Sequence, residues 1–183
     1  MSYKETLLRS IKLPEIDQDV SHKVGTKLLI VLGEGGHTKE MLTLVEMLGG
    51  DYEYGYVMPF DDGVSEQKLR YPGKVFRVIR PRDKVHHLLN DIWKTLRCAL
   101  QCVSAVRRFK PTAVISAGPS LAVPACFVAK LMGAKVIFVE TGSRITALSF
   151  TGKLVYPFAD LYFVQSEQLT KRYKRAIYAG RLF

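Results

Sequence analysis

Residues 27–42 constrain the fold of this chain more than any other segment. The apolar run 28–32 is typical of a buried strand. It ends at Gly33, Gly35 and Gly36, and apolar residues then recur with helical spacing. A strand, a tight glycine turn and a helix begin an α/β fold. Because the N–H groups and dipole at a helix start favour an anion, we expect a phosphate or diphosphate at this turn.

Strand and helix signals alternate along the rest of the chain. The predicted strands are 28–32, 52–58, 75–79, 113–116, 135–139 and 159–164, and the predicted helices are 37–48, 85–109, 121–132 and 166–173. Such alternation predicts an α/β fold with a mostly parallel sheet covered on both faces. We therefore expect a single Rossmann-like domain over residues 27–183, preceded by an N-terminal extension, 1–26, with an amphipathic pattern.

Length and composition set further limits. A chain of 183 residues with 48% hydrophobic residues can bury one core. The three cysteines stand in apolar contexts without metal-ligand spacing, so we predict neither a disulfide framework nor a metal site, and we expect a reducing, cytosolic environment. Since no window reaches about 18 uncharged apolar residues, we expect no signal peptide and no spanning helix, and any membrane contact is expected to be peripheral.

The positive charge is concentrated in one segment. The net charge is +10 at pH 7, and residues 68–110 account for all of it, with twelve Lys or Arg against two acidic residues. Such a segment attracts the phosphates of nucleic acids, of anionic lipid headgroups or of a lipid-linked diphosphate. A solvated basic face is the other interpretation. Because no aromatic-interleaved recognition module accompanies the charges, we do not expect a nucleic-acid partner.

The long helix 85–109 carries an apolar stripe. The residues expected to face the sheet are Val85, Leu88, Leu89, Ile92, Leu96, Ala99, Val103 and Val106. Trp93 lies at the edge of this stripe, close to Lys94 and Arg97. An aromatic side chain with cationic neighbours is typical of a peripheral membrane surface. The helix is therefore interpreted either as a crossover helix that packs on the sheet or as one that also contacts a membrane.

Three turns follow buried strands, at residues 33–37, 116–120 and 140–144. In a parallel sheet such turns meet at the carboxyl ends of the strands, where ligands bind, so we expect them to line one crevice. The first turn has Thr38 where a dinucleotide fingerprint needs its third glycine. Lys39 also comes too early for a Walker A loop. Neither nucleotide motif is therefore predicted.

Two side chains at these turns are candidates for catalysis. His37 stands at the helix start, where it could donate to a phosphate or take a proton from an attacking hydroxyl. A capping or packing histidine is the alternative. Glu140 ends an apolar strand, where a carboxylate could bind a sugar hydroxyl or pair with Arg144.

Several motifs occur in an order that resembles one family. They are Gly-x-Gly-Gly-His-Thr-x-Glu-Met-Leu at 33–42, Arg-Pro-Arg at 80–82, Ala-Gly-Pro at 117–119 with Val-Pro at 123–124, Val-Glu-x-x-Ser-Arg at 139–144 with Leu-Ser-x-Thr-Gly-Lys-Leu at 148–154, Phe-Val-Gln at 163–165 and Tyr-Ala-Gly-Arg-Leu-Phe at 178–183. Over residues 27–183 the chain resembles the acceptor-side, membrane-recruiting subunit of the two-subunit UDP-N-acetylglucosamine transferase that elongates N-acetylglucosaminyl-diphosphodolichol. Small prokaryotic subunits of capsular and exopolysaccharide glycosyltransferases are similar.

The resemblance implies a fold and a function. The fold would be the N-terminal, Rossmann-like half of a GT-B glycosyltransferase. A separate small partner would supply the half that holds the UDP-sugar, while this chain, without a cofactor of its own, would hold a lipid-diphosphate acceptor at the cytosolic face of a membrane. That membrane would be the endoplasmic reticulum in a eukaryote and the plasma membrane in a prokaryote. The alternatives are transfer of another UDP-sugar, or a non-catalytic scaffold that recruits the partner.

The resemblance also implies site residues. The residues that it places near the acceptor diphosphate and the reacting hydroxyl are Gly35, Gly36, His37, Thr38, Gly118, Pro119, Glu140, Ser143 and Arg144. The residues that it places against the partner are Gly180, Arg181, Leu182 and Phe183. This sequence departs from the family in two ways: Glu34 stands where a small residue is usual, and the spanning helix of the eukaryotic members is not found before residue 27.

Overall fold

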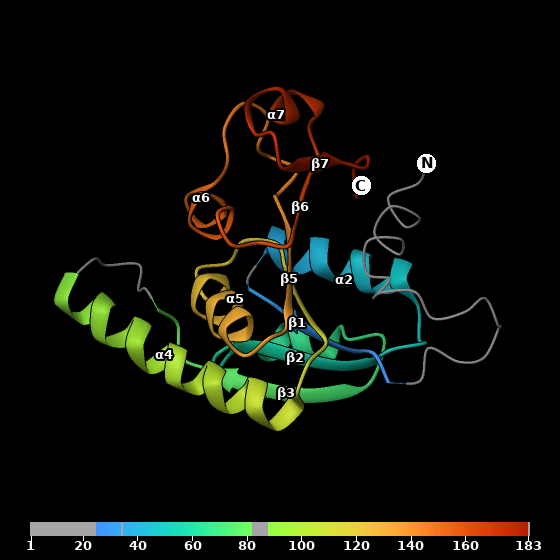
Figure 1. Cartoon of the computed structure of the whole chain (residues 1–183). Coiled ribbons are helices and arrows are strands. Elements are labelled where there is room, and N and C mark those ends of the chain that lie inside the picture. The colour runs from blue at the N-terminus through green and yellow to red at the C-terminus, as the bar shows by residue number, and fades with distance from the viewer. Residues whose placement is uncertain (1–24, 34, 82–87, 183) are drawn as a thin grey trace.

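A computed structural model describes residues 25–33, 35–81 and 88–182 (Figure 1). The strands are β1 (Lys27–Val31), β2 (Glu53–Pro59), β3 (Gly73–Val78), β4 (Ala113–Ser116), β5 (Lys135–Val139), β6 (Leu161–Val164) and β7 (Ala176–Tyr178). The helices are α2 (Gly36–Leu48), α3 (Gly63–Gln67), α4 (Leu88–Phe109), α5 (Ala122–Leu131), α6 (Phe150–Val155) and α7 (Glu167–Arg172). The predicted strands are confirmed, whereas α3, α6 and β7 were not predicted. The predicted extension lies outside the described residues up to position 24.

The described strands form one parallel sheet in the order β3-β2-β1-β4-β5-β6-β7. The predicted α/β fold with a parallel sheet is therefore confirmed. The chain reverses its direction of growth between β1 and β4, and that switch point is where ligands bind in open sheets of this kind. Figure 1 shows α2 on one face of the sheet and α4, α5 and α6 on the other.

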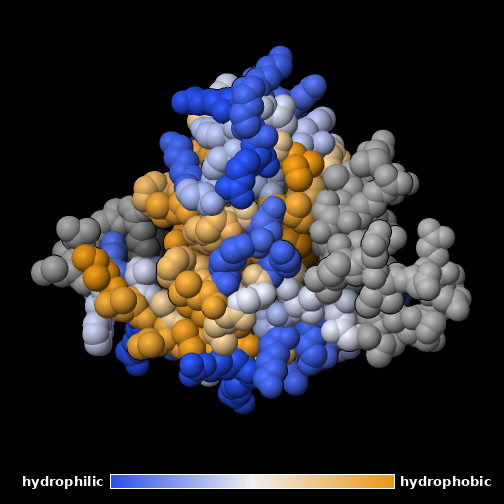
Figure 2. Space-filling view, in the orientation of Figure 1, coloured by the Kyte–Doolittle hydropathy of each residue, from blue (hydrophilic) through white to orange (hydrophobic). Residues whose placement is uncertain are grey.

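Helix α4 packs on the sheet with a face that coincides only in part with the one predicted. Ile92 and Leu96, which were expected in the core, have 52% and 55% of their surface exposed. The N-terminal half of α4 extends beyond the other elements (Figure 1), so it has no sheet to cover. The described residues of this helix that are buried are Cys98, Cys102, Ala105, Val106 and Phe109. Of the predicted stripe, Ala99 and Val103 are partly buried, Val106 is buried, and the side chains of Val85, Leu88 and Leu89 lie outside the described residues. Figure 2 shows hydrophobic surface left exposed over this side of the molecule.

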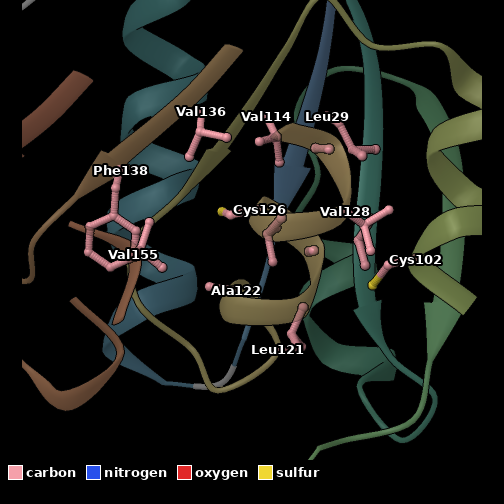
Figure 3. Packing of buried hydrophobic residues seen from close by; sticks show 14 of the residues in the cluster. Leu29, Cys102, Val114, Leu121, Ala122, Cys126, Val128, Val136, Phe138 and Val155 are labelled. Atoms are coloured by element: carbon pink, nitrogen blue, oxygen red, sulfur yellow. The ribbon is translucent and has the colours of Figure 1, made fainter. Parts of the chain in front are cut away.

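Alternate residues of the central strand build a core on each face of the sheet. Leu28, Ile30 and Leu32 pack with the apolar side of α2, whereas Leu29 and Val31 face α4 and α5. Figure 3 shows the second of these cores, in which sheet residues pack over the helix that carries Cys126. Burial raises the pKa of the Cys126 thiol to about 12. This side chain therefore contributes to the packing of the core and does not act as a nucleophile.

Asp160 ties three elements together beside β6. Its Oδ2 accepts a hydrogen bond of 2.8 Å from the backbone N–H of Val136 in β5, and its Oδ1 lies 2.7 Å from Nζ of Lys130 in α5. Burial alone would raise the pKa of this carboxyl, but the ammonium of Lys130 and the Val136 N–H outweigh it and lower the pKa. The ionised form of Asp160 therefore stabilises the fold.

Candidate functional site

The turn between β1 and α2 lies against the turn after β4. A Cβ at Gly33 would overlap the ring of Pro119, so a side chain at Gly33 would push the two turns apart. Gly35, which precedes α2, has a φ of 61°, a conformation that favours glycine. The Thr38 hydroxyl is buried and donates a 2.6 Å hydrogen bond back to the carbonyl of Gly33. Thr38 therefore closes the turn, and its hydroxyl is turned inward.

His37 lies in the first turn of α2, beside the turn after β4. Its side chain is 34% exposed, and a Cβ at Gly118 would stand 3.6 Å from its Cε1. Gly118 has a φ of 95°, a conformation that favours glycine, so it provides the turn beside the imidazole, and a Cβ there would only contact the ring. The first backbone N–H groups of a helix lack intrahelical partners, and no acidic side chain stands in the first turn of α2. The exposed backbone of Gly35 and Gly36 beside His37 is therefore suited to an anion.

Glu40, which sequence reasoning missed, ties α2 to the turn after β5. Glu40 is 1% exposed, and its Oε1 accepts hydrogen bonds from the Thr141 hydroxyl at 3.0 Å and the Gly142 N–H at 2.8 Å. The amide of Gln165 donates to the same oxygen at 3.1 Å. Burial would raise the pKa of Glu40, but the adjacent His37 and these donors lower it overall. The site therefore holds a buried carboxylate.

The second oxygen of Glu40 faces the imidazole. Oε2 lies 3.8 Å from Nδ1 of His37, which is beyond hydrogen-bond range. Among the described residues, neither of these two buried atoms has a hydrogen-bond partner. The three-residue spacing on a helix places both side chains on one side, and that spacing was the available signal in the sequence.

Glu140 holds the scaffold beneath the third turn. It is 1% exposed; Oε1 accepts from the Thr141 N–H at 3.1 Å, and Oε2 accepts from the Ser149 N–H at 3.0 Å and the Tyr162 hydroxyl at 2.7 Å. Burial and the Glu140 carboxylate raise the pKa of Tyr162, which keeps its hydroxyl a donor. A Cβ at Gly152 would overlap Oε2 of Glu140. The described hydrogen bonds of Glu140 thus fasten its strand to α6 and β6.

The remaining predicted residues of the third turn are exposed. Ser143 Oγ lies 3.4 Å from Thr141 Oγ1, and the backbone N–H of Arg144 donates to the Thr141 carbonyl at 3.0 Å. The exposed Arg144 side chain is not among the described partners of Glu140. The three turns meet at one edge of the sheet, since Gly33 contacts the second turn and Glu40 binds the third. Glu34 lies outside the described residues.

The C-terminal segment reaches the same edge from β7. Leu182 is 7% exposed and packs in the core cluster of α2 and the central strands, and its N–H donates to Oε1 of Gln165 at 2.9 Å. Gly180 has a φ of 101°, and the side chain of Arg181 is exposed. Phe183 lies outside the described residues. Sequence reasoning missed the role of Gln165, although the residue belongs to one of the quoted motifs.

A groove opens beside the first turn, between α2 and α3. Its volume is about 830 Å³, and Gly35 and Thr38 are among the residues that line it. The wall from α3 and the loop before it carries the acidic Asp61 and Asp62, with Arg70 beyond. Such a mixed polar wall suits hydroxyl groups. In the described part of the chain, no cluster of His, Cys, Asp and Glu side chains is arranged for a metal ion.

Large apolar side chains on α4, α5 and α6 are exposed on one side of the molecule (Figure 2). They are Ile92, Trp93, Leu96, Leu100, Phe127, Leu131, Phe150 and Leu154, and we call this set the apolar face. Lys94 is partly buried and Arg97 is exposed on the same helix as Trp93. None of the described helices is long and apolar enough to cross a membrane.

Solved structures share this architecture. MurG of Acinetobacter baumannii matches 76% of this chain with a TM-score of 0.60 and 18% identity, and the match spans 40% of MurG. UDP-GlcNAc 2-epimerase of Neisseria meningitidis matches 86% with a TM-score of 0.65 and 14% identity, over 47% of that enzyme. The chain therefore has the fold of one half of a GT-B enzyme, as predicted.

Sequence comparison then gives the family. A family model described as "Oligosaccharide biosynthesis protein Alg14 like" matches residues 28–182, and the chain belongs to this Alg14 family. Similar proteins include the UDP-N-acetylglucosamine transferase subunits ALG14 of Rattus norvegicus and Schizosaccharomyces pombe. They are 31% and 33% identical over 177 and 172 residues, which is 85% and 84% of this chain and 82% and 81% of theirs. The predicted resemblance is confirmed.

Proposed function

We propose that this chain is the acceptor-side subunit of a UDP-N-acetylglucosamine transferase whose donor-binding half is a separate protein. Its relatives are named as transferase subunits, and its fold corresponds to less than half of MurG. The observation that carries the proposal is the meeting of three turns around a partly exposed His37 at the carboxyl edge of the sheet. A cleft enzyme needs a second wall facing this edge, which the partner would supply.

The acceptor is a sugar linked to a polyprenyl diphosphate. Its diphosphate would lie at the backbone of Gly35 and Gly36, where the start of α2 favours negative charge. Gly118 and Pro119 shape the neighbouring wall, and the exposed Ser143 and Arg144 are within the third turn. The groove between α2 and α3 shares Gly35 and Thr38 with the first turn, but its lining includes neither His37 nor residues of the second and third turns, so the sugar is not placed in it. UDP-N-acetylglucosamine would be held mainly by the partner, and this chain would need no cofactor.

His37 is the candidate base. In an inverting transfer the acceptor hydroxyl oxygen forms a bond to the anomeric carbon, the bond from that carbon to UDP breaks, and the hydroxyl proton passes to the imidazole. The Glu40 carboxylate beside Nδ1 stabilises the positive charge that the imidazole then carries. Glu140, the other candidate, would act through the scaffold that it holds.

The apolar face would bring the site to the cytosolic side of a membrane. Exposed Leu and aromatic side chains on α4, α5 and α6 suit the boundary between headgroups and acyl chains. Lys94 and Arg97 on α4 suit anionic headgroups. Peripheral binding of this kind gives access to a lipid-linked acceptor.

Replacing His37 tests the function directly. In the reconstituted pair, His37→Ala should lower the transfer rate about 100-fold or more, because a general base typically contributes that much. The partner should still co-purify with this variant. Glu167→Ala, at an exposed position on α7 outside the groove and the three turns, is the control and should leave the rate unchanged. A rate within about threefold of wild type would exclude His37 as the general base. If variants at all the candidate site residues still transferred sugar, the alternative of a non-catalytic scaffold that recruits the partner would be favoured. A panel of UDP-sugars in the same assay identifies the donor.

A further inference from the structure

Gln165, directly after β6, connects the C-terminal segment to the candidate site. Its side chain is 4% exposed. Oε1 accepts the Leu182 N–H at 2.9 Å, and Nε2 donates to Oε1 of Glu40 at 3.1 Å and to the Glu140 carbonyl at 3.2 Å. One amide thus joins the end of the chain, helix α2 and the end of β5.

The orientation of this amide is fixed by the chemistry of its neighbours. A backbone N–H donates, whereas an ionised carboxylate and a backbone carbonyl accept. Rotating the amide by half a turn would set its NH₂ group against the Leu182 N–H and its oxygen against the Glu40 carboxylate. Both contacts would be lost in a buried place, where unmatched polar groups are costly. When Leu182 is packed in the core, its N–H therefore helps to orient Nε2 of Gln165 toward Glu40.

The position of Glu40 in turn sets its contact with His37. Oε1 is held by Thr141, Gly142 and Gln165, while Oε2 is left facing the imidazole Nδ1 at 3.8 Å. Hydrogen bonds between nitrogen and oxygen form at about 2.7–3.2 Å. A displacement of the carboxylate by about 1 Å therefore decides whether a hydrogen bond to His37 forms. A change at Gln165 can therefore alter the surroundings of the imidazole through the side chain of Glu40.

We propose that Gln165 is a positioning residue that couples the seating of Leu182 to the orientation of His37 through Glu40. The inference rests on the proposed function, in which His37 is the base, and it takes residues 180–183 as the segment that meets the donor-binding partner, as the family resemblance implies. Docking that shifts Leu182 would then alter the Glu40–His37 contact, so the partner would complete the site from this side as well as by supplying its own wall. The chain alone would hold His37 in a different orientation from the assembled pair.

The coupling is measurable in the full chain without a partner or a substrate. The NMR signal of the His37 Cε1–H group, identified by its loss in His37→Asn, is recorded for wild type, Leu182→Ser, Gln165→Met and the double variant. Leu182→Ser unseats a buried apolar side chain. We expect it to shift the His37 signal in the wild-type background, and to produce less than about a quarter of that shift beside Gln165→Met, because the connection is then cut.

Two further variants make the result specific. Gln168→Met changes an exposed glutamine on α7 and should preserve the full shift. Glu40→Gln keeps the side-chain size and cuts the connection at the next residue, so it should abolish the shift even if Gln165→Met folds poorly. An equal shift from Leu182→Ser in the wild-type, Gln165→Met and Glu40→Gln backgrounds would overturn the proposal.

Kinetics of the assembled pair separate positioning from simple stability. Gln165→Met should lower kcat about tenfold or more while the KM for the acceptor stays within about twofold, because binding by the turns is retained. An unchanged kcat would overturn the proposed role. If the wild-type pair transfers no sugar, the proposed function fails, whereas the NMR experiment still decides whether the connection exists.

Discussion

Two buried glutamates at the edge of the sheet that forms the candidate site differ in their hydrogen-bond partners. Glu40 and Glu140 are each 1% exposed, and donors of this chain surround both. Both oxygens of Glu140 accept described hydrogen bonds, whereas Glu40 keeps one oxygen toward His37. Glu140 therefore stabilises the fold around the site, whereas Glu40 has one oxygen available to interact with the imidazole of His37.

Replacing Glu140 tests that division. Glu140→Gln puts an NH₂ group where the carboxylate accepts from Ser149, Thr141 or Tyr162, so the free energy of unfolding should fall by about 2–3 kcal/mol. Urea denaturation measures the difference. Glu46→Gln, which removes an exposed ion pair with Arg70, is the control and should cost less than about 1 kcal/mol. Equal stability of the two variants would contradict the scaffold role.

The site was partly predictable from particular residues. Gly33, Gly35, Gly118 and His37 stand at turns after apolar strands, and the rule that such turns meet at one edge of a parallel sheet brought them together. The connection through Gln165 was not predictable, because it joins residues 17 and 125 positions away in the sequence. Hydrogen bonds of that kind depend on the final packing of β6 against α2 and leave no periodic signal.

Among the helices and strands too, the local sequence pattern predicts some features, whereas others depend on tertiary packing. The strand 113–116 was predictable because its apolar run is fully buried. Helix α6 and strand β7, with 6 and 3 residues, are too short for a periodic pattern. On α4 the pattern was misread, because Ile92 and Leu96 are apolar without facing the sheet. Their exposure on the projecting half of the helix is the observation behind the proposed membrane contact.

The exposed side of α4 should bind membranes. Replacing Leu96 and Leu100 together by Ser removes two exposed apolar groups, and partition onto vesicles with anionic lipid should fall about tenfold or more, since burying one Leu contributes about 1.5–3 kcal/mol. Co-sedimentation measures the partition. Raising the salt concentration should weaken wild-type binding through the basic side chains.

The control for this surface lies on another helix. Val64 on α3 is 62% exposed and lies outside the apolar face, so Val64→Ser should leave partition unchanged. The membrane role of α4 would be contradicted if the double Leu variant sedimented like wild type.

Asp160 makes the contact between α5 and β5 sensitive to acid. Its pKa is lowered in the folded state, so its contribution to stability is present above the unfolded value of 3.8 and is lost as the pH falls through the lower folded value. Asp160→Asn should reduce the free energy of unfolding by about 1–2 kcal/mol at pH 7, and this difference should shrink below about pH 4. Denaturant titrations from pH 7 to pH 2 test this. A difference that stays constant over the range would contradict it, and the exposed Glu167→Gln is the control.

As a whole, the molecule has the fold of one half of a GT-B enzyme. The Alg14 family match covers residues 28–182, and the fold corresponds to 40–47% of the two GT-B-type enzymes compared above. The turns, the groove beside α2 and the C-terminal segment lie at one edge, while the apolar face covers α4, α5 and α6. Under the proposed function, this arrangement would let one chain meet a membrane-bound acceptor and a donor-binding partner with different surfaces.

Equilibrium binding to this chain alone tests the proposed division of substrates between the two proteins. A short-chain polyprenyl diphosphate carrying N-acetylglucosamine and UDP-N-acetylglucosamine are titrated separately by calorimetry. The lipid-linked sugar should bind at least about tenfold more tightly, a difference of about 1.4 kcal/mol. Both ligands carry a diphosphate that can meet the start of α2, but the wall proposed to hold the uridine belongs to the partner. Equal affinity, or tighter binding of UDP-N-acetylglucosamine, would contradict the account.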